Sequence, residues 1–169
     1  MGLLRFIANL KFLPEGRRLE FYPPFFMMRA KVLEISDNWR RVHIRLPLNS
    51  ISRNPGGVMF GGYQACLADP IAAIACSRVF PGHSVWTRAM TVDFQKGGST
   101  DLELRFTMPP EQEAAIAQEL KAKGRATPTF EYGFYLTDGS LCTLIRNTVA
   151  IRPKGYRKAT TPPANLDGL

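Results

Sequence analysis

The sequence predicts an α+β domain in which a curved antiparallel sheet wraps around one long buried helix. The helix is indicated by the stretch from Asn54 to Arg78, which begins as a glycine-rich loop and continues as an alanine-rich segment. The sheet is indicated by segments on both sides that alternate apolar and polar residues, as half-buried strands do. Turn residues such as Asp138-Gly139 join these segments into hairpins, so neighbouring strands are expected to run antiparallel.

One domain is expected, because 169 residues can bury a core but are few for two domains. We assign residues 1–24 to an N-terminal helix and connection, residues 25–153 to the sheet-and-helix domain, and residues 154–169 to a tail. No apolar run approaches about 18 residues, so no membrane span is expected, and the N-terminus lacks the features of a signal peptide. Three cysteines without metal-ligand spacing indicate a reduced, cytoplasmic protein, and neither a metal nor a cofactor is expected.

The individual elements follow from periodicity and turn residues. Helices are expected at residues 1–13, 61 to about 81, and 109–123, with a connection over residues 16–24. Strands are expected at residues 25–36, 39–46, 84–96, 102–108, 129–137 and 141–152. In the strand at 84–96, simple alternation places Trp86 and Met90 on one face and Thr87 on the other.

The charge of the chain indicates an anionic partner or surface, since the formal net charge is +8 and the pI is near 9.8. The sequence has no nucleic-acid-binding motif and its basic residues are scattered, so nucleic acid is not the expected partner. A small polyphosphate ligand fits the positive charge as well as a nucleic acid does. The densest basic cluster consists of Arg152, Lys154, Arg157 and Lys158. A plain solvated basic surface is the alternative explanation.

Asp69 is the feature of the central helix that calls for an explanation. It is the only charged residue between Asn54 and Arg78, within a segment that is apolar nearly all round. A carboxylate in a buried helix is costly unless it is paired or used, and burial would raise its pKa towards that of a useful base. At the start of the same helix, Gly61 and Gly62 would leave backbone amides free to meet a ligand.

The spacing of these residues resembles that of a known family. The pattern Asn54-x-x-Gly57-x-x-Phe60-Gly61-Gly62, with Asp69 fifteen residues after the asparagine, is similar to hotdog-fold acyl-CoA thioesterases of the phenylacetyl-CoA thioesterase type. The segments 67–70 and 85–89 look closer still to an uncharacterised branch of that superfamily. This resemblance implies a hotdog fold, hydrolysis of an acyl-CoA or related thioester without a cofactor, and a homodimer or dimer of dimers.

The resemblance also implies roles for particular residues. Asp69 would act as general base or nucleophile towards the thioester, and Asn54 would hold the substrate or the attacking water. The amides of Gly61 and Gly62 would polarise the thioester carbonyl, and Thr87 would reach the site from the neighbouring subunit. Each position has a structural alternative, in which Asp69 is hydrogen-bonded within the helix packing, Asn54 forms a turn, Thr87 is an ordinary strand residue, and the glycines allow close packing.

Phe60 departs from the family, because many relatives have a histidine immediately before the glycine pair. We expect its ring either to line the acyl pocket of the substrate site or to close that pocket off. A non-catalytic acyl-CoA or lipid-binding hotdog module is the alternative to an enzyme. A hydratase or dehydratase would pair a histidine with a carboxylate, but His43 and His83 both lie outside the loop-and-helix stretch, so this function ranks lower.

Overall fold

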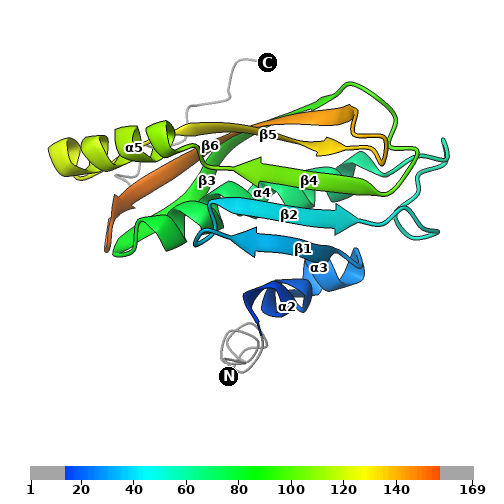
Figure 1. The fold of residues 1–169 in the computed structure, drawn as a ribbon, viewed down its shortest axis with the longest axis horizontal. Coiled ribbons are helices and arrows are strands. Elements are labelled where there is room, and N and C mark those ends of the chain that lie inside the picture. Colours follow the sequence, from blue (N-terminus) through cyan, green and yellow to red (C-terminus); the bar gives the residue numbers. More distant parts are fainter. Residues whose placement is uncertain (1–13, 157–169) are drawn as a thin grey trace, which may run out of the picture.

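The computed structural model describes residues 14–156, so the helix expected over residues 1–13 and most of the expected tail lie outside the described residues. Six strands form one antiparallel sheet in the order β1-β2-β4-β5-β6-β3 (Figure 1). Their bounds are Lys31–Ser36 for β1, Arg41–Leu46 for β2, His83–Phe94 for β3, Leu102–Thr107 for β4, Thr129–Tyr135 for β5 and Leu141–Pro153 for β6. The predicted α+β class is confirmed.

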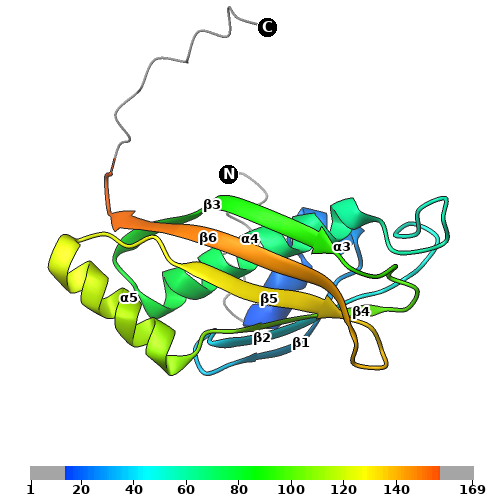
Figure 2. The same cartoon turned by 90° about the horizontal axis from the view of Figure 1, so that it is seen from above.

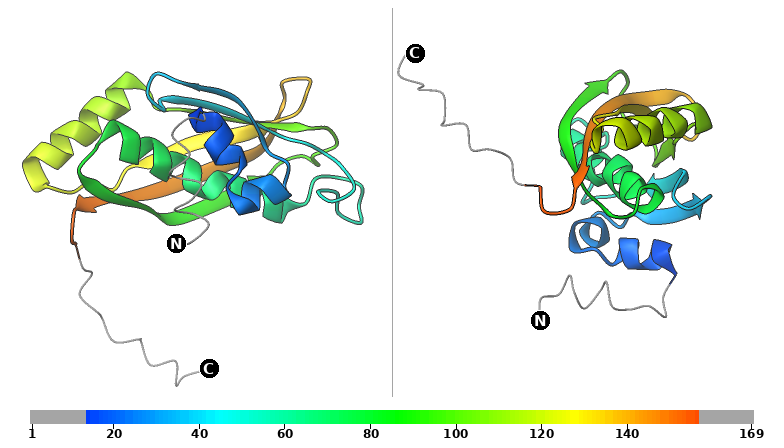
Figure 3. Two further views of the ribbon diagram at one scale, coloured as in Figure 1. Left: turned by 90° about the horizontal axis from the view of Figure 1, so that it is seen from below. Right: turned by 90° about the vertical axis from the view of Figure 1, so that its left-hand side faces the viewer.

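Helix α4 (Gly61–Val79) crosses one face of the curved sheet (Figures 1 and 2), and the end-on view in Figure 3 shows the sheet bending around it. Its sheet-facing side is buried and consists of Gln64, Leu67, Ala68, Ile71, Ala72, Ala75 and Cys76. These side chains pack against the apolar residues of the strands, such as Ile44, Phe106 and Phe134, to form one core. The central helix predicted from the alanine-rich stretch is therefore present, with the sheet around it.

The segment before β1 is helical, so the predicted connection over residues 16–24 and strand from Phe25 are wrong. Helix α2 covers Glu15–Glu20 and helix α3 covers Pro23–Met27. Proline at the first positions of a helix suits the structure, because its fixed φ is helical and the missing N–H has no helical partner there. Arg29, with φ of 55°, follows α3 and turns the chain before β1 begins.

A β-bulge in β3 changes which side chains face the helix. β3 pairs with β6, and the register shifts between Thr87 and Ala89. Simple alternation assigned Thr87 and Met90 to opposite faces, but the bulge places both on the side of α4. Trp86 turns outward instead and is 40% exposed.

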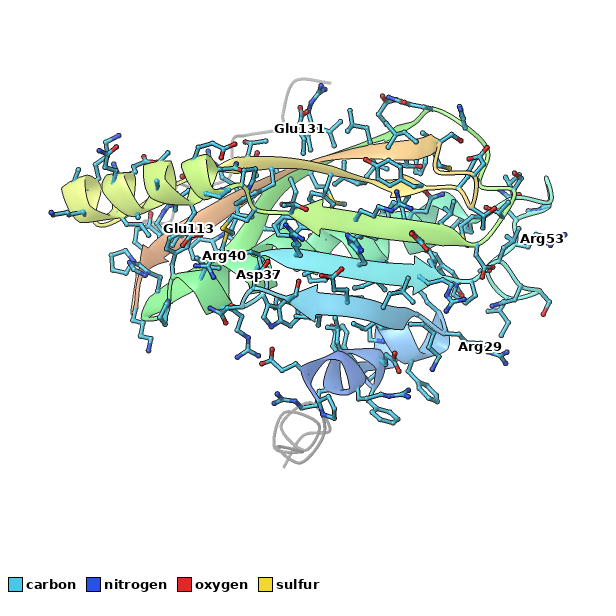
Figure 4. The ribbon with its side chains drawn as sticks, in the orientation of Figure 1. Arg29, Asp37, Arg40, Arg53, Glu113 and Glu131 are labelled. Atoms are coloured by element: carbon cyan, nitrogen blue, oxygen red, sulfur yellow. The ribbon has the colours of Figure 1, made fainter. Side chains whose placement is uncertain are left out.

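Helix α5 (Pro110–Lys123) ends as predicted at Gly124, whose φ of 65° lies in the left-handed region. An ion pair fixes its first turn to the turn between β1 and β2 (Figure 4), because Arg40 Nε and Nη2 each donate to the Glu113 carboxylate at 2.6 Å. The hydrogen bond from Arg40 lowers the pKa of Glu113. None of the helices within residues 14–156 is long and apolar enough to cross a membrane.

Candidate functional site

Asp69 lies in the middle of α4 but on its exposed side. The sheet covers only one side of the helix, and the other carries Cys66, Ser77 and Arg78 as further exposed residues. The expectation of a carboxylate buried on all sides is therefore wrong for the single chain. Asp69 instead lines an open groove of about 760 Å³ that lies between α4 and the pair α2–α3.

The backbone beside Asp69 is held by side chains from the sheet. Pro70 interrupts the hydrogen bonding of α4, because it has no N–H to donate to the carbonyl four residues before it. Tyr132 Oη donates to the Ala68 carbonyl at 2.7 Å, and Asn147 Nδ2 lies 3.0 Å from both the Asp69 carbonyl and Tyr132 Oη. β5 and β6 therefore fix the turn of helix that carries the carboxylate.

Thr87 takes part in the same network. Its Oγ1 donates to the Asp69 carbonyl at 2.7 Å. This contact is within one chain, whereas the resemblance implied a Thr87 that reaches the site of the neighbouring subunit. The role of Thr87 towards a neighbouring subunit stays a prediction.

Sequence reasoning missed Tyr132 and Asn147. Asn147 is fully buried in β6, where asparagine is an unusual residue for a strand, and that is the signal which could have identified it. Its Oδ1 is buried without a hydrogen-bond partner among the described residues. The buried amide therefore serves the helix backbone through its Nδ2 alone.

Burial and the charge of Asp69 change the pKa values of two nearby residues, Tyr132 and Cys66. Burial raises the pKa of Tyr132, against the opposing effect of the Asn147 hydrogen bond, and the charge of Asp69 raises it further. The phenol therefore stays protonated and remains a donor. Partial burial and the charge of Asp69 raise the pKa of Cys66, so its thiol is neutral at pH 7 and is a poor nucleophile.

The start of α4 presents two free amides. Within residues 14–156, neither the Gly61 nor the Gly62 N–H donates a hydrogen bond. A Cβ on Gly61 would lie 2.7 Å from the Phe94 ring, and one on Gly62 would overlap the Phe60 ring. Glycine avoids these two clashes, and Gly61 also lines a cavity of the surface. Phe60 precedes them with 51% of its surface exposed.

Asn54 shapes the loop that leads to this helix start. Its Oδ1 accepts from the Val58 amide at 3.3 Å, and its carbonyl accepts from Gly57 N at 2.9 Å, so it does form a turn. It also lines a second cavity of about 510 Å³ together with Phe60 and Gly61.

Gln64 is a further lining residue of this second cavity that sequence reasoning missed. It is 2% exposed, and its Oε1 accepts from Thr143 Oγ1 at 2.6 Å. Polar residues on the sheet-facing side of an apolar helix are the signal that could have identified it.

Within one chain, the predicted site residues lie in two separate places. Asp69 lines the first groove, whereas Asn54, Phe60 and Gly61 line the second cavity. Eight residues separate Gly61 from Asp69, which at 1.5 Å per residue is about 12 Å along the helix. A single thioester carbonyl cannot meet both the amides and the carboxylate of the same chain.

The two histidines lie away from the candidate site. His43 Nδ1 lies 3.3 Å from the Glu34 carboxylate in the β1–β2 pair, and neither His43 nor His83 lines either cavity. Across residues 14–156, no group of three or more His, Cys, Asp or Glu side chains is placed to hold a metal ion.

Known proteins share this fold at low sequence identity. A family model described as "Domain of unknown function (DUF4442)" matches residues 18–148. No curated protein sequence matches the chain significantly.

Among solved structures, a Pseudomonas aeruginosa protein described as a probable thioesterase has a TM-score of 0.72 at 17% identity, covering 83% of this chain and 96% of its own. A thioesterase from Haemophilus influenzae has a TM-score of 0.62 at 13% identity, covering 84% and 91%. The phenylacetic acid degradation protein PaaI from Thermus thermophilus, as a mutant, has a TM-score of 0.54 at 18% identity, covering 76% and 97%. At these identities the likeness establishes the hotdog fold.

Proposed function

The chain belongs to the family described as a domain of unknown function, DUF4442, and we propose that it hydrolyses an acyl-CoA thioester to the free acid and CoA. The fold that it shares with solved thioesterases supports this reaction class. In the proposed reaction Asp69 acts as the general base or as the nucleophile. As a base, it accepts a proton from water while the water oxygen adds to the thioester carbonyl; the C–S bond then breaks and the CoA thiolate takes up a proton.

The observation that carries the proposal is the layout of α4. Its first turn presents the amides of Gly61 and Gly62 without an acceptor in the described chain, and two turns later it presents the carboxylate of Asp69. Such amides are preorganised donors for a developing oxyanion, and losing one donor of this kind costs about 10²–10³ in rate. Asn54, beside the amides, would hold the substrate or the attacking water through its Nδ2.

We further propose that each site is built from two chains, as a homodimer or a dimer of dimers. The separation of about 12 Å between the amides and the carboxylate motivates this, because only a second copy can bring the two groups together. β3 lies at the edge of the sheet and can pair with β3 of another copy. Such two-fold pairing runs the two α4 helices antiparallel, so that the start of one can approach Asp69 of the other.

Asp69→Asn tests the catalytic role, because it keeps the shape of the side chain and removes the base. We expect release of free thiol from a panel of acyl-CoAs to fall by at least about 10²-fold, while the melting temperature and the affinity for a non-hydrolysable acyl-CoA stay close to parental. Asp138→Asn is the matched control, since Asp138 is an exposed carboxylate in the turn between β5 and β6 and lines neither cavity. Parental turnover in Asp69→Asn would make Asp69 a structural residue and would remove the proposed chemistry.

A further inference from the structure

The groove that Asp69 lines extends well beyond the carboxylate. Its volume of about 760 Å³ lies within the range of small-molecule sites, about 300–1,000 Å³. Its walls are mainly apolar and come from α4, from the N-terminal helices that lie beside α4 in Figure 3, and from Trp39 in the turn between β1 and β2. The apolar lining residues that matter here are Leu19, Tyr22, Phe25, Trp39 and Ile74.

The apolar part of the groove has a definite length. It follows α4 from Asp69 to Arg78, nine residues on, which is about 13 Å. Its far end is polar, because Glu15 accepts a hydrogen bond from Trp39 Nε1 at 2.5 Å and pairs with Arg78 at 3.1 Å. An extended alkyl chain with C–C bonds of about 1.5 Å advances about 1.3 Å per carbon, so about ten carbons fit between Asp69 and this polar end.

We propose that this groove binds the acyl chain of the substrate, a straight chain of up to about ten carbons with its thioester at Asp69. The inference rests on the proposed function. An acyl chain is the occupant that the lining favours, because Asp69 lines the groove and a thioester attacked by that carboxylate has its first acyl carbons beside it. The ion pair of Glu15 and Arg78 then limits chain length, since an apolar tail gains nothing by displacing it.

Chain-length profiles on the full-length protein test the proposal. The probes are non-hydrolysable S-alkyl-CoA thioethers with alkyl chains from C4 to C16, measured by calorimetry beside hydrolysis of the matching acyl-CoAs. For the parent we expect affinity to rise roughly fourfold per added methylene up to about ten carbons and then to level off.

Two variants narrow the groove at different depths. Ile74→Trp blocks the groove about 7.5 Å beyond Asp69, so affinity should stop rising at about six carbons. Ser77→Trp blocks it about 12 Å beyond Asp69, so affinity should stop rising near nine carbons. Leu33→Trp is the control, because Leu33 is 45% exposed on β1 and lines neither cavity; its plateau should match the parental one. Thermal melting checks folding, and exposed Ser77 carries the test if Ile74→Trp fails to fold.

The outcomes separate this inference from the proposed function. If acyl-CoAs are hydrolysed with dependence on Asp69 but the plateau is the same in both groove variants and the control, the acyl chain lies elsewhere and the inference is overturned alone. If the thioethers show the expected shifts and no thioester is hydrolysed, the groove is an acyl site and the hydrolase proposal fails. Affinity independent of chain length in the parent would overturn the groove assignment outright.

Discussion

At the scale of single residues, Phe60 combines a position at the start of α4 with an exposed ring. It lines the second cavity beside Asn54 and packs edge-on against Tyr63, with ring centroids 5.8 Å apart. In the proposed two-chain site it would lie next to the thioester carbonyl and the first acyl carbons of the partner's substrate.

Phe60→His should therefore change substrate preference more than stability. Because the ring is half exposed, we expect the free energy of unfolding to change by no more than about 0.5 kcal/mol, while the ratio of kcat/KM between branched or aryl and straight-chain acyl-CoAs shifts severalfold. Denaturant unfolding and a substrate panel measure the two effects. A substrate profile identical to the parental one would leave Phe60 as a packing residue against Gly62.

Tyr132 acts on Asp69 only through the helix backbone, so we regard it as a positioning residue. Tyr132→Phe removes two buried hydrogen bonds, one to the Ala68 carbonyl and one from Asn147 Nδ2, which should lower the free energy of unfolding by about 1–3 kcal/mol. kcat should also fall, with little change in KM, because the turn that carries Asp69 loosens.

Tyr135→Phe is the matched control for this change. Tyr135 lies on the same strand, and its ring packs under the Arg105 guanidinium at 4.7 Å, an interaction that phenylalanine keeps. If Tyr132→Phe lost stability as expected but kept parental kcat at a temperature where it is folded, the network would be structural only.

At the scale of elements, sequence periodicity predicted most helices and strands correctly. It did not predict the N-terminal helices or the direction in which Thr87 points. The alanine-rich stretch predicted α4, and alternation predicted the hairpins, because each pattern matches the repeat of its element. The Pro23-Pro24 pair was interpreted as the end of a connection before a strand, whereas it starts a helix, since proline both breaks strands and starts helices. The bulge that turns Thr87 inward inserts one residue into an otherwise regular strand, and alternation alone does not reveal where.

Sequence pattern alone also explains why Asp69 was wrongly expected to be buried on all sides. Its sequence neighbours are apolar nearly all round, and that pattern fits a helix buried on all sides. A helix that lies between a sheet and a groove, or against a second copy, has the same composition. One sequence cannot tell these environments apart, whereas the spacing from Asn54 to Asp69 identified residues that do line the two cavities.

The docking of α5 onto the sheet should depend on pH. The hydrogen bonds from Arg40 lower the pKa of Glu113 from its ordinary value near 4.5, so the folded state holds the carboxylate ionised more strongly than the unfolded state does. The resulting stability is present above that ordinary value and is lost as the pH falls through the lower pKa of the folded state.

Glu113→Gln should accordingly be less stable than the parent at pH 7, with the difference shrinking as the pH falls below about 4.5. Urea unfolding between pH 3 and pH 7 measures this. Glu111→Gln, at an exposed position in the same turn, is the control and should follow the parental curve. A constant difference between Glu113→Gln and the parent at all pH values would rule out the ion pair as its cause.

At the scale of the whole molecule, the proposed site depends on two copies of the chain. The carboxylate and the helix-start amides of one chain are about 12 Å apart along α4 and line different cavities, so the proposed chemistry has to combine Asp69 of one subunit with Asn54, Gly61 and Gly62 of another. We propose that Thr87 acts in the Asp69 half, because its hydroxyl bonds the Asp69 carbonyl of its own chain. The assignment of residues to halves can be tested by exchanging subunits.

The most direct measurement is the activity regained when two inactive variants exchange subunits. Mixed one to one, Asp69→Asn and Asn54→Ala chains should form heterodimers with one doubly damaged and one intact site, which restores about a quarter of parental activity. Asp69→Asn mixed with Thr87→Ala should restore nothing, because both changes fall on the same half. Exchange is verified by mass spectrometry, and Asn54→Ala and Thr87→Ala must each be clearly impaired alone. Recovery in the first mixture and none in the second is then the predicted result. No recovery in the first mixture would contradict the two-chain site.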